Sequence, residues 1–354
     1  MKETHTEGMP YKPLPDEDLA NVIVQAAAAF EALKDARVLL TGGTGFFGHW
    51  LLESLLRANR EMRLSVRVTV LTRDAARFRS ESAWVADDAA ITLLEGDVRN
   101  FQFPDGSFSH IVHAATDSGG QQSGRMDVEL YDDILRGMQR VLDFAHASGV
   151  KRILYVSTGA VYGRSTQMLK TPENYLEQRE VRLPEGSYEA TKKAAEMLCL
   201  ERSAFDSLEC VIARPFAFVG PRLPLDAHFA IGNFLSAAMR NETIVVKGDG
   251  TPRRSWMYMS DLAAWLWTLL VRGEDGRAYN VGSEEAYSIR EAAQITAETL
   301  APGIGVEIQG VPAMGAAMNN YVPSVERARV ELGLQVTVSL VEALRKTAQW
   351  YAAM

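Results

Sequence analysis

Cysteine is scarce in this sequence, which has two cysteines among 354 residues. Cys199 and Cys210 form no CxxC motif, and no histidine stands at a spacing that would complete a metal site with them. Their neighbours indicate a helix and a buried strand. We therefore predict two inert core thiols in a reducing cytoplasm, and neither a nucleophilic cysteine nor a bound metal.

Positive charge is also in short supply. Lys and Arg number 37 against 45 Asp and Glu, which gives a formal net charge of -8 and a pI near 5.4. The sequence shows no dense basic cluster, whereas nucleic-acid-binding proteins usually carry a basic stripe. This balance argues against a nucleic-acid partner. A small anionic substrate needs only one or two cations and stays possible.

Long apolar runs are missing as well. No run approaches the roughly 20 residues of a membrane-spanning helix. The amino-terminal segment MKETHTEGMPYKPLPDED lacks the charged-then-apolar pattern of a secretion signal. We therefore expect no membrane partner and a cytoplasmic location.

Short apolar runs alternate with helix-like stretches over much of the chain. The runs are RVLL, VRVTVL, ITLLEG, HIVHAA, RILYVS and LECVIAR. This rhythm predicts an α/β fold, with a Rossmann-type doubly wound parallel sheet covered by helices on both faces. An acidic start followed by apolar residues at helical spacing predicts an amphipathic helix over residues 17–34, within an N-terminal extension of residues 1–35.

The pattern changes after Arg214, where proline and glycine punctuate the sequence. The change predicts an NAD(P)-binding domain over residues 36–213 and a smaller, mainly substrate-binding lobe over residues 214–354. A buried-strand pattern near residues 278–282 predicts that the chain returns there to the first sheet.

A glycine-rich turn joins the first apolar run to a helix. In TGGTGFFG, Gly42, Gly45 and Gly48 recur every three residues. Glycine permits the tight turn and lets the backbone approach a pyrophosphate, while the N–H groups at the helix start bind its oxygens. Because strand, turn and helix occur in this order, we predict a dinucleotide site rather than a simple tight turn.

The end of the second predicted strand bears on the choice of nicotinamide cofactor. NAD-binding proteins usually place an acid there for the ribose hydroxyl, whereas NADP-binding proteins supply an arginine for the phosphate. Thr72 holds the position and Arg73 follows, so NADP is favoured. Asp74 lies close enough to the strand end that NAD remains an alternative cofactor. Arg73 could also be a solvated loop residue that contacts no cofactor. Asp97, after the third strand, is predicted either to bind the adenine amino group or to cap its loop.

Tyr188 and Lys192 lie four residues apart on a predicted helix and so share a face. A phenol has a pKa of about 10, and a nearby ammonium group favours the phenolate, which brings the group into working range as an acid or base. The same lysine can hold the nicotinamide ribose. One such pair can arise by chance, and a surface helix pair is the alternative.

Six motifs in order resemble the extended short-chain dehydrogenase/reductases, specifically the nucleotide-sugar epimerases and dehydratases. The motifs are TGGTGFFG, HAAT, VSTGAVYG, YEATK, RPFAFVGP and GDGTPRRSWMYMSDLA. The resemblance implies a catalytic triad of Thr158, Tyr188 and Lys192. Thr158 would hydrogen-bond the sugar oxygen, and Tyr188 would exchange its proton during hydride transfer at sugar C4. Ser157 is expected to face the sheet instead, because side chains alternate along a strand.

The resemblance also assigns cofactor contacts outside the triad. Phe46 and Phe47 would lie over the pyrophosphate turn, and Ala114 and Ala115 would line the cofactor floor. The remaining predicted cofactor contacts are Val98 and Pro215.

In the predicted substrate lobe, the resemblance places a diphosphate-binding arginine at Arg254. A guanidinium fork matches two phosphate oxygens, whereas Arg253 is expected to be solvated. Asn233 resembles an asparagine that contacts sugar or phosphate, with a helix cap as the alternative. The implied partner is a nucleotide diphosphate sugar, and the implied assembly is a homodimer through helices around 127–148 and 188–204.

The sequence departs from the family pattern directly after Thr158. The 4,6-dehydratases carry an Asp-Glu pair there to move protons at C5 and C6, but this chain has Gly159 and Ala160. We therefore predict an NDP-sugar 4-epimerase or a 4-keto-sugar reductase. The alternatives are a dehydratase that takes its carboxylate from elsewhere, an enzyme for steroid-like or flavonoid-like carbonyls, and a non-catalytic NADP-binding sensor. A later family motif, which usually carries an Arg and an Asp, has Asn320 and Ser324 near those positions instead. The sequence therefore does not assign the nucleotide contacts in that region.

Overall fold

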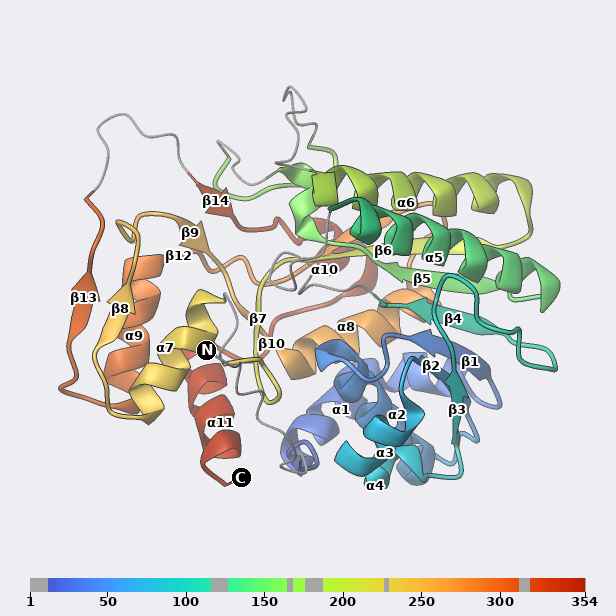
Figure 1. The fold of residues 1–354 in the computed structure, drawn as a ribbon, viewed down its shortest axis with the longest axis horizontal. Coiled ribbons are helices and arrows are strands. Elements are labelled where there is room, and N and C mark those ends of the chain that lie inside the picture. Colours follow the sequence, from blue (N-terminus) through green and yellow to red (C-terminus); the bar gives the residue numbers. More distant parts are fainter. Residues whose placement is uncertain are drawn as a thin grey trace.

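The computed structural model describes residues 12–115, 127–163, 168–175, 187–225, 229–311 and 319–353. Seven strands of this described part form one parallel sheet, in the order β11-β6-β5-β4-β1-β2-β3 (Figure 1). The strands are β1 (Arg37–Thr41), β2 (Arg67–Thr72), β3 (Ile91–Glu95), β4 (His110–His113), β5 (Arg152–Val156), β6 (Glu209–Pro215) and β11 (Ala278–Val281). The predicted α/β fold with a parallel sheet is confirmed.

The central strands are buried on both faces, which explains why they are nearly continuous apolar runs. In β1, Val38, Leu39 and Leu40 are each at most 1% exposed. β-branched and large aliphatic side chains suit this environment because helices cover both faces of a parallel sheet. The predicted return of the chain to the sheet is also observed, since β11 pairs in parallel with β6.

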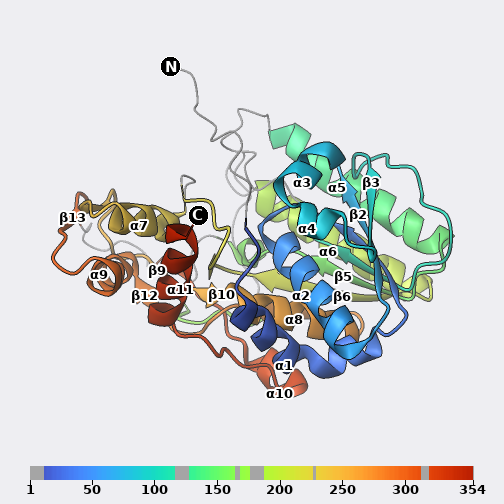
Figure 2. The ribbon, with the colours of Figure 1, turned by 90° about the horizontal axis from the view of Figure 1, so that it is seen from below.

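Helices cover the two faces of the sheet unequally (Figures 1 and 2). On one face lie α5 (Asp127–Ala147) and α6 (Ser187–Phe205), the two helices assigned to the predicted dimer; the dimer itself stays a prediction. On the other lie α1 (Asp16–Ala32), α2 (Phe46–Met62) and α8 (Met259–Arg272), with α3 (Ala75–Glu81) and α4 (Ala83–Ala86) beside them. Within the described ranges, no helix combines the length and the apolar character needed to cross a membrane.

The C-terminal lobe lies beside the sheet and consists of short elements (Figure 1). Its helices are α7 (Ala230–Met239), α9 (Ile289–Leu300) and α11 (Leu340–Ala352), while α10 (Glu326–Leu332) packs near β11. Its strands pair as β8 (Ile244–Val246) with β13 (Val306–Ile308), as β7 (Phe218–Val219) with β10 (Met257–Tyr258), and as β9 (Arg253–Arg254) with β12 (Tyr287–Ser288) and β14 (Asn320–Tyr321).

The N-terminal helix α1 joins the sheet domain to the lobe. It begins after Pro15, close to the predicted start, and packs against α8 and α2. The Asp18 carboxylate accepts hydrogen bonds from the Tyr258 hydroxyl at 2.6 Å and from the Lys346 amine of α11 at 3.0 Å. The extension is therefore anchored on both parts, and its residues 1–11 lie outside the described residues.

Cys199 and Cys210 form a disulfide, with their Cα atoms 6.3 Å apart. The prediction of two unpaired thiols is therefore wrong. After α6 the chain turns back into β6, and this turn brings both fully buried cysteines to the contact between helix and strand. A spacing of eleven residues does not reveal this contact, because it depends on how the helix packs on the sheet. The expectation of a reducing compartment relied on unpaired thiols, so the disulfide removes its support.

Candidate active site

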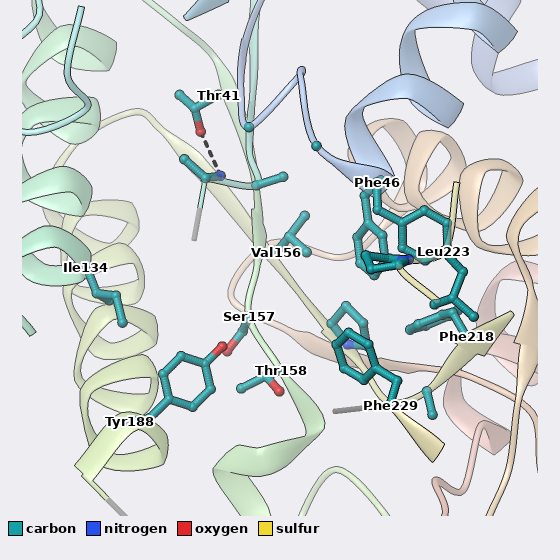
Figure 3. A pocket seen from close by; sticks show the side chains of 18 of the residues that line it. Thr41, Phe46, Ile134, Val156, Ser157, Thr158, Tyr188, Phe218, Leu223 and Phe229 are labelled. Carbon is teal, nitrogen blue, oxygen red and sulfur yellow. Dashed lines mark hydrogen bonds between the residues drawn. The ribbon is translucent and has the colours of Figure 1, made fainter. Parts of the chain in front are cut away.

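A cavity of about 900 Å³ lies between the strand ends of the sheet and the C-terminal lobe (Figure 3). Residues at the ends of β1, β2, β4 and β5 line one side, and residues after β6 and in the lobe line the other. The predicted site residues that line it are Gly42, Gly45, Phe46, Phe47, Arg73, Asp97, Val98, Ala114, Ala115, Thr158, Tyr188, Pro215 and Arg254.

The glycine turn fits a dinucleotide on steric grounds. Gly42 has φ +75°, and a Cβ atom there would stand 2.6 Å from the carbonyl group of Ala114. Gly45 precedes the first turn of α2, whose backbone N–H groups have no partner inside the helix. Gly48 plays a different part, because a Cβ atom on it would stand 2.3 Å from the backbone of Gly43. Gly48 therefore lets α2 pack closely on the turn and is not among the cavity-lining residues.

The floor of the cavity is fastened by hydrogen bonds between neighbouring strand ends. Thr41 accepts a hydrogen bond from the backbone N–H of Ala115 at 3.1 Å (Figure 3). The Thr41 hydroxyl also lies 2.7 Å from Nδ1 of His113. These contacts hold the ends of β1 and β4 in register, with Ala114 and Ala115 at the cavity.

Asp74, the acid that would favour NAD, caps a helix in the structure. Asp74 is the N-cap of α3 and accepts a hydrogen bond from the backbone N–H of Arg77 at 2.8 Å. Its own backbone N–H donates to the Thr72 hydroxyl at 3.2 Å. Arg73, in contrast, is exposed and lines the cavity. The end of β2 therefore presents a cation to the cavity, while the neighbouring carboxylate caps a helix.

Asp97 caps its loop, which is one of the two roles predicted for it. Its carboxylate accepts two hydrogen bonds from the Arg99 guanidinium, at 2.8 and 3.0 Å, and one from the Arg99 backbone N–H at 2.9 Å. The hydrogen bond with the Arg99 side chain is the main cause that lowers the pKa of Asp97. The residue thus caps its loop and also lines the cavity, where its predicted contact with adenine stays a prediction.

Tyr188 projects from α6 into the cavity, and its hydroxyl points toward the Ser157 side chain, with Thr158 beside them (Figure 3). The prediction that Ser157 faces the sheet is wrong. β5 ends at Val156, so the alternation of side chains along a strand no longer applies at Ser157. Ser157 and Thr158 both line the cavity. Burial is the main cause that raises the pKa of Tyr188.

Lys192 is buried and is not among the residues that line the cavity. Its side chain is 1% exposed, its Nζ donates to the carbonyl of Val156 at 3.1 Å, and it stands 4.7 Å from the centre of the Tyr155 ring. Burial lowers the pKa of Lys192 to about 7. In this structure, therefore, desolvation of both groups outweighs the help that an ammonium group would give to the Tyr188 phenolate.

A buried ion pair ties α6, which carries Tyr188 and Lys192, to the sheet. Arg214 of β6 donates to both carboxylate oxygens of Glu196 on α6, at 2.6 and 3.0 Å. The same guanidinium donates to the Tyr162 hydroxyl at 2.6 Å, and that hydroxyl donates to Asn280 at 2.8 Å. These bonds tie α6 to β6, to β11 and to the 3₁₀ turn η1 (Gly159–Tyr162) that follows Thr158.

The two arginines of β9 differ in their surroundings. Arg254 lines the cavity, and its Nη1 donates to the Asn319 carbonyl at 3.0 Å and to the Asn319 side chain at 3.1 Å. Burial lowers the pKa of Arg254. Arg253 turns toward the Ala286 carbonyl at 3.1 Å and lies 3.8 Å from the Glu291 carboxylate. Asn233, in contrast, is exposed on α7 and is absent from the cavity-lining residues, so its predicted substrate contact gains no support.

Sequence reasoning missed two aromatic residues that line the cavity, Tyr321 and Phe216. Tyr321 of β14 lines the cavity, and burial raises its pKa to about 12. Phe216 packs on Tyr321 with ring centres 4.7 Å apart. A Cβ atom at Gly159 would stand 2.7 Å from the Phe216 ring, so that ring fills the space beside the turn. No local pattern marked Tyr321, because strand pairing with Arg254 brings it to the cavity.

The Rossmann-type sheet carries the glycine turn and Tyr188 at one cavity, with Lys192 buried one helical turn further along α6. This combination is typical of the extended short-chain dehydrogenase/reductases. Residues 38–282 match the sequence model of the NAD dependent epimerase/dehydratase family, and this chain belongs to that family. The resemblance stated from the motifs is therefore confirmed, and the relatives found are enzymes.

Two curated relatives show the range of activities around this chain. It is 26% identical over 317 residues to UDP-glucuronic acid decarboxylase 1 of Danio rerio, which covers 89% of this chain and 72% of the relative. It is 25% identical over 327 residues to dTDP-glucose 4,6-dehydratase of Streptomyces niveus, which covers 89% of this chain and 92% of the relative.

Similar solved structures likewise include both a dehydratase and an epimerase. DesIV, a dTDP-glucose 4,6-dehydratase from Streptomyces venezuelae solved with NAD bound, matches with a TM-score of 0.74 and 25% identity, covering 90% of this chain and 97% of that one. A UDP-glucose 4-epimerase from Thermotoga maritima matches with a TM-score of 0.74 and 19% identity, covering 90% and 99%, and shows the shared fold.

Proposed function

We propose that this chain is an NADP-dependent enzyme that oxidises or reduces C4 of a nucleotide diphosphate sugar, as a 4-epimerase or as a reductase of a 4-keto sugar. The observation that carries the proposal is that one cavity of about 900 Å³ is lined by the glycine turn, by Tyr188 and by Arg254. A dinucleotide at the turn and a diphosphate at the arginine would place a sugar between them, at the tyrosine.

Arg254, Tyr188 and Lys192 would each have a separate role in this reaction. Arg254 would hold the substrate diphosphate with its guanidinium fork. Tyr188 would take the proton from O4 when the sugar is oxidised and return it when the sugar is reduced, a role worth about 10²-fold to 10⁴-fold in rate. Lys192, behind Tyr188, would position the helix face and the nicotinamide ribose. The nicotinamide, when bound, supplies or accepts the hydride.

A 4,6-dehydratase is the second candidate, and one residue favours it. Glu189 follows Tyr188 on α6 and lines the cavity, so a carboxylate does reach this space from outside the turn after Thr158. Elimination of water needs both an acid for the leaving hydroxyl and a base for the carbon-bound proton. Gly159 and Ala160 supply neither, and the Phe216 ring packs against Gly159. Epimerase or reductase chemistry therefore ranks first.

The experiment that tests the proposal is a product analysis. The purified chain is incubated with UDP-linked and dTDP-linked hexoses and with their 4-keto-6-deoxy forms, with and without NADPH, and the products are identified by NMR. A C4 epimer formed without added NADPH indicates an epimerase, and NADPH consumed in equal amount with a 4-keto sugar indicates a reductase. A 4-keto-6-deoxy product from a hexose supports the second candidate, and no product from any of them contradicts the proposal.

A matched arginine pair tests the diphosphate assignment on the substrate found. Arg254→Ala should raise the KM at least 10-fold with a smaller effect on kcat, because a charge-assisted contact to substrate is lost in both the ground and transition states. Arg253→Ala, on the same strand but turned away from the cavity, should change the KM less than threefold. Similar KM values in the two variants would remove Arg254 from the diphosphate site.

The proposed preference for NADP predicts a selective effect at Arg73. Arg73→Ala should raise the Kd for NADPH by about 10-fold to 100-fold, the value of a hydrogen bond to a charged group, and should leave the Kd for NADH nearly unchanged. Arg79→Ala is the control, since Arg79 lies on α3 and pairs with Asp87 at 2.8 Å. Calorimetric titration measures both values, and an equal rise for the two cofactors would show that Arg73 does not read the 2′-phosphate.

A further inference from the structure

A tight turn after β7 leads into the wall of the cavity. The turn runs from Gly220 to Leu223 and is closed by a hydrogen bond from the Leu223 backbone N–H to the Gly220 carbonyl at 3.1 Å. Leu223 and the next residue, Pro224, line the cavity (Figure 3). The position of this turn therefore sets the shape of that part of the wall.

Arg222 stands in this turn at a position where glycine is usually found. Its φ is +72°, in the left-handed region that most L-residues avoid. Pro221 precedes it, and a turn with proline at its second residue and a positive φ at its third favours glycine at the third. Strained backbone persists where its surroundings hold it, often at functional sites. The contacts of the Arg222 side chain should therefore explain why an arginine stands here.

The Arg222 side chain reaches the helices on the cofactor side of the cavity. The residue is 7% exposed, and its Nη2 donates to the Ser82 hydroxyl at 3.2 Å. Its guanidinium carbon lies 5.8 Å from the centre of the Trp84 ring. Ser82 lies between α3 and α4, and Trp84 lies on α4. A planar guanidinium suits this place because it donates a hydrogen bond and approaches an aromatic ring at the same time.

The backbone of the turn is held from two further directions. The indole N–H of Trp50 on α2 donates to the Pro221 carbonyl at 3.1 Å. The Tyr351 hydroxyl of α11 donates to the Leu223 carbonyl at 2.5 Å. Because α2 begins at the glycine turn, the contact with Trp50 also leads to the cofactor site. The turn is therefore attached both to the helices beside the predicted cofactor site and to the C-terminal lobe.

Helix α3 connects Arg222 with the proposed 2′-phosphate contact. It begins two residues after Arg73, and Ser82 follows its last residue. All seven residues of α3 belong to the described part of the chain, and among them only Phe78 is buried. Elements with few buried contacts shift or open most readily. The position of α3 should therefore respond to a phosphate bound by Arg73.

We propose that Arg222 is a positioning residue that couples the cofactor site to the substrate wall. A cofactor phosphate at Arg73 fixes α3, the fixed end of α3 holds Arg222, and Arg222 holds Leu223 at the cavity. The substrate wall belongs to the proposed function, on which this inference rests; the attachment of the turn to the cofactor-side helices does not. Coupling between two sites is reciprocal, so a bound nucleotide diphosphate should tighten the cofactor by the same factor.

Calorimetric titration with UDP, with and without saturating NADPH, measures this coupling. In the wild type, NADPH should lower the Kd for UDP at least about fivefold, the lower end of typical coupling between sites. Arg222→Gly suits the positive φ, so the variant should fold, and its ratio of the two Kd values should fall below about twofold. Ser82→Ala should lower the ratio too and add nothing in the Arg222→Gly background. An uncoupled wild type, or a ratio preserved in Arg222→Gly, overturns the proposal.

A second arginine with positive φ provides the matched control. Arg63 has φ +54° at the end of α2, where it is exposed and is not among the cavity-lining residues. Arg63→Gly makes the same change of side chain and backbone freedom, and it should keep the wild-type ratio. A ratio lost equally in Arg63→Gly would trace the effect to the glycine and contradict a specific role of Arg222.

Hydrogen exchange gives a second measurement that needs no substrate. Mass spectrometry on fragments that resolve Leu223 follows the N–H group that closes the turn. NADPH should slow this exchange at least about threefold in the wild type and leave it unchanged in Arg222→Gly. If UDP does not bind and no nucleotide sugar is converted, the proposed function fails while this exchange still decides the coupling. Exchange that NADPH slows equally in both proteins, or in neither, overturns the proposal.

Discussion

Tyr188→Phe should lower kcat by about 10³-fold and leave the Kd for NADPH within a few-fold of wild type. The phenol is the proposed proton carrier, and general acid–base groups contribute about 10²-fold to 10⁴-fold to rate. The aromatic ring stays in place, so the cavity wall that α6 provides is preserved. Steady-state kinetics and cofactor titration on the same preparation measure both quantities.

A partly buried tyrosine outside the cavity serves as the control for this change. Tyr287 lies on β12, where its hydroxyl donates to Glu285 at 3.0 Å, so Tyr287→Phe should retain wild-type kcat. Tyr188→Phe with more than a tenth of wild-type kcat would show that another group carries the proton. A loss of NADPH affinity as large as the loss of kcat would instead indicate damage to the cofactor site.

Lys192→Met should stabilise the fold while it impairs turnover. Lys192 is buried with its amine against the Val156 carbonyl, and burial lowers its pKa to about 7. An unfolded lysine has a pKa of about 10.4, so folding must either strip its proton or bury a charge. Methionine has a similar shape and no charge. We expect a gain on the order of 3 kcal/mol in the free energy of unfolding at pH 7.

The stabilisation by Lys192→Met should depend on pH. Between pH 7 and about 10.4 the unfolded chain binds more protons at Lys192 than the folded chain, so the stability of the wild type rises with pH over this range. The penalty is complete below pH 7 and absent above about 10.4, where both states are neutral. The advantage of Lys192→Met in urea unfolding should therefore shrink as the pH is raised from 7 to 10.

The neighbouring lysine offers a matched control. Lys193 is exposed on the same helix, so Lys193→Met should change the free energy of unfolding by less than about 0.5 kcal/mol at either pH. A Lys192→Met protein that is less stable than wild type at pH 7 would mean that the contacts of the amine outweigh its desolvation.

The sheet and the cofactor turn could be predicted because local sequence determines them. Gly42 carries a positive φ and nearly touches the Ala114 backbone, so glycine at this position follows directly from the turn. The strands could be predicted because burial on both faces produces uninterrupted apolar runs. Tyr188 and Lys192 could be paired from helical spacing alone, which placed both in the same region of the fold.

The features that escaped prediction depend on contacts between distant segments. The disulfide of Cys199 and Cys210 requires the packing of α6 on β6. Tyr321 reaches the cavity only because β14 pairs with β9. Ser157 was misplaced by applying strand alternation one residue beyond the end of β5. The first two features depend on how distant elements pack, and the third on where one strand ends.

The anchoring of α1 has a consequence for how the protein is made. The indole N–H of Trp350 donates to the Pro13 carbonyl at 3.1 Å, and Lys346 donates to Asp18 at 3.0 Å. These contacts join segments separated by 337 residues, as in the pair Pro13 and Trp350. A ribosome releases α11 long after α1 has emerged, so the lobe carrying Arg254 and Tyr321 can be locked onto the sheet domain only late in synthesis. Substrate binding should therefore be among the last properties that a nascent chain acquires.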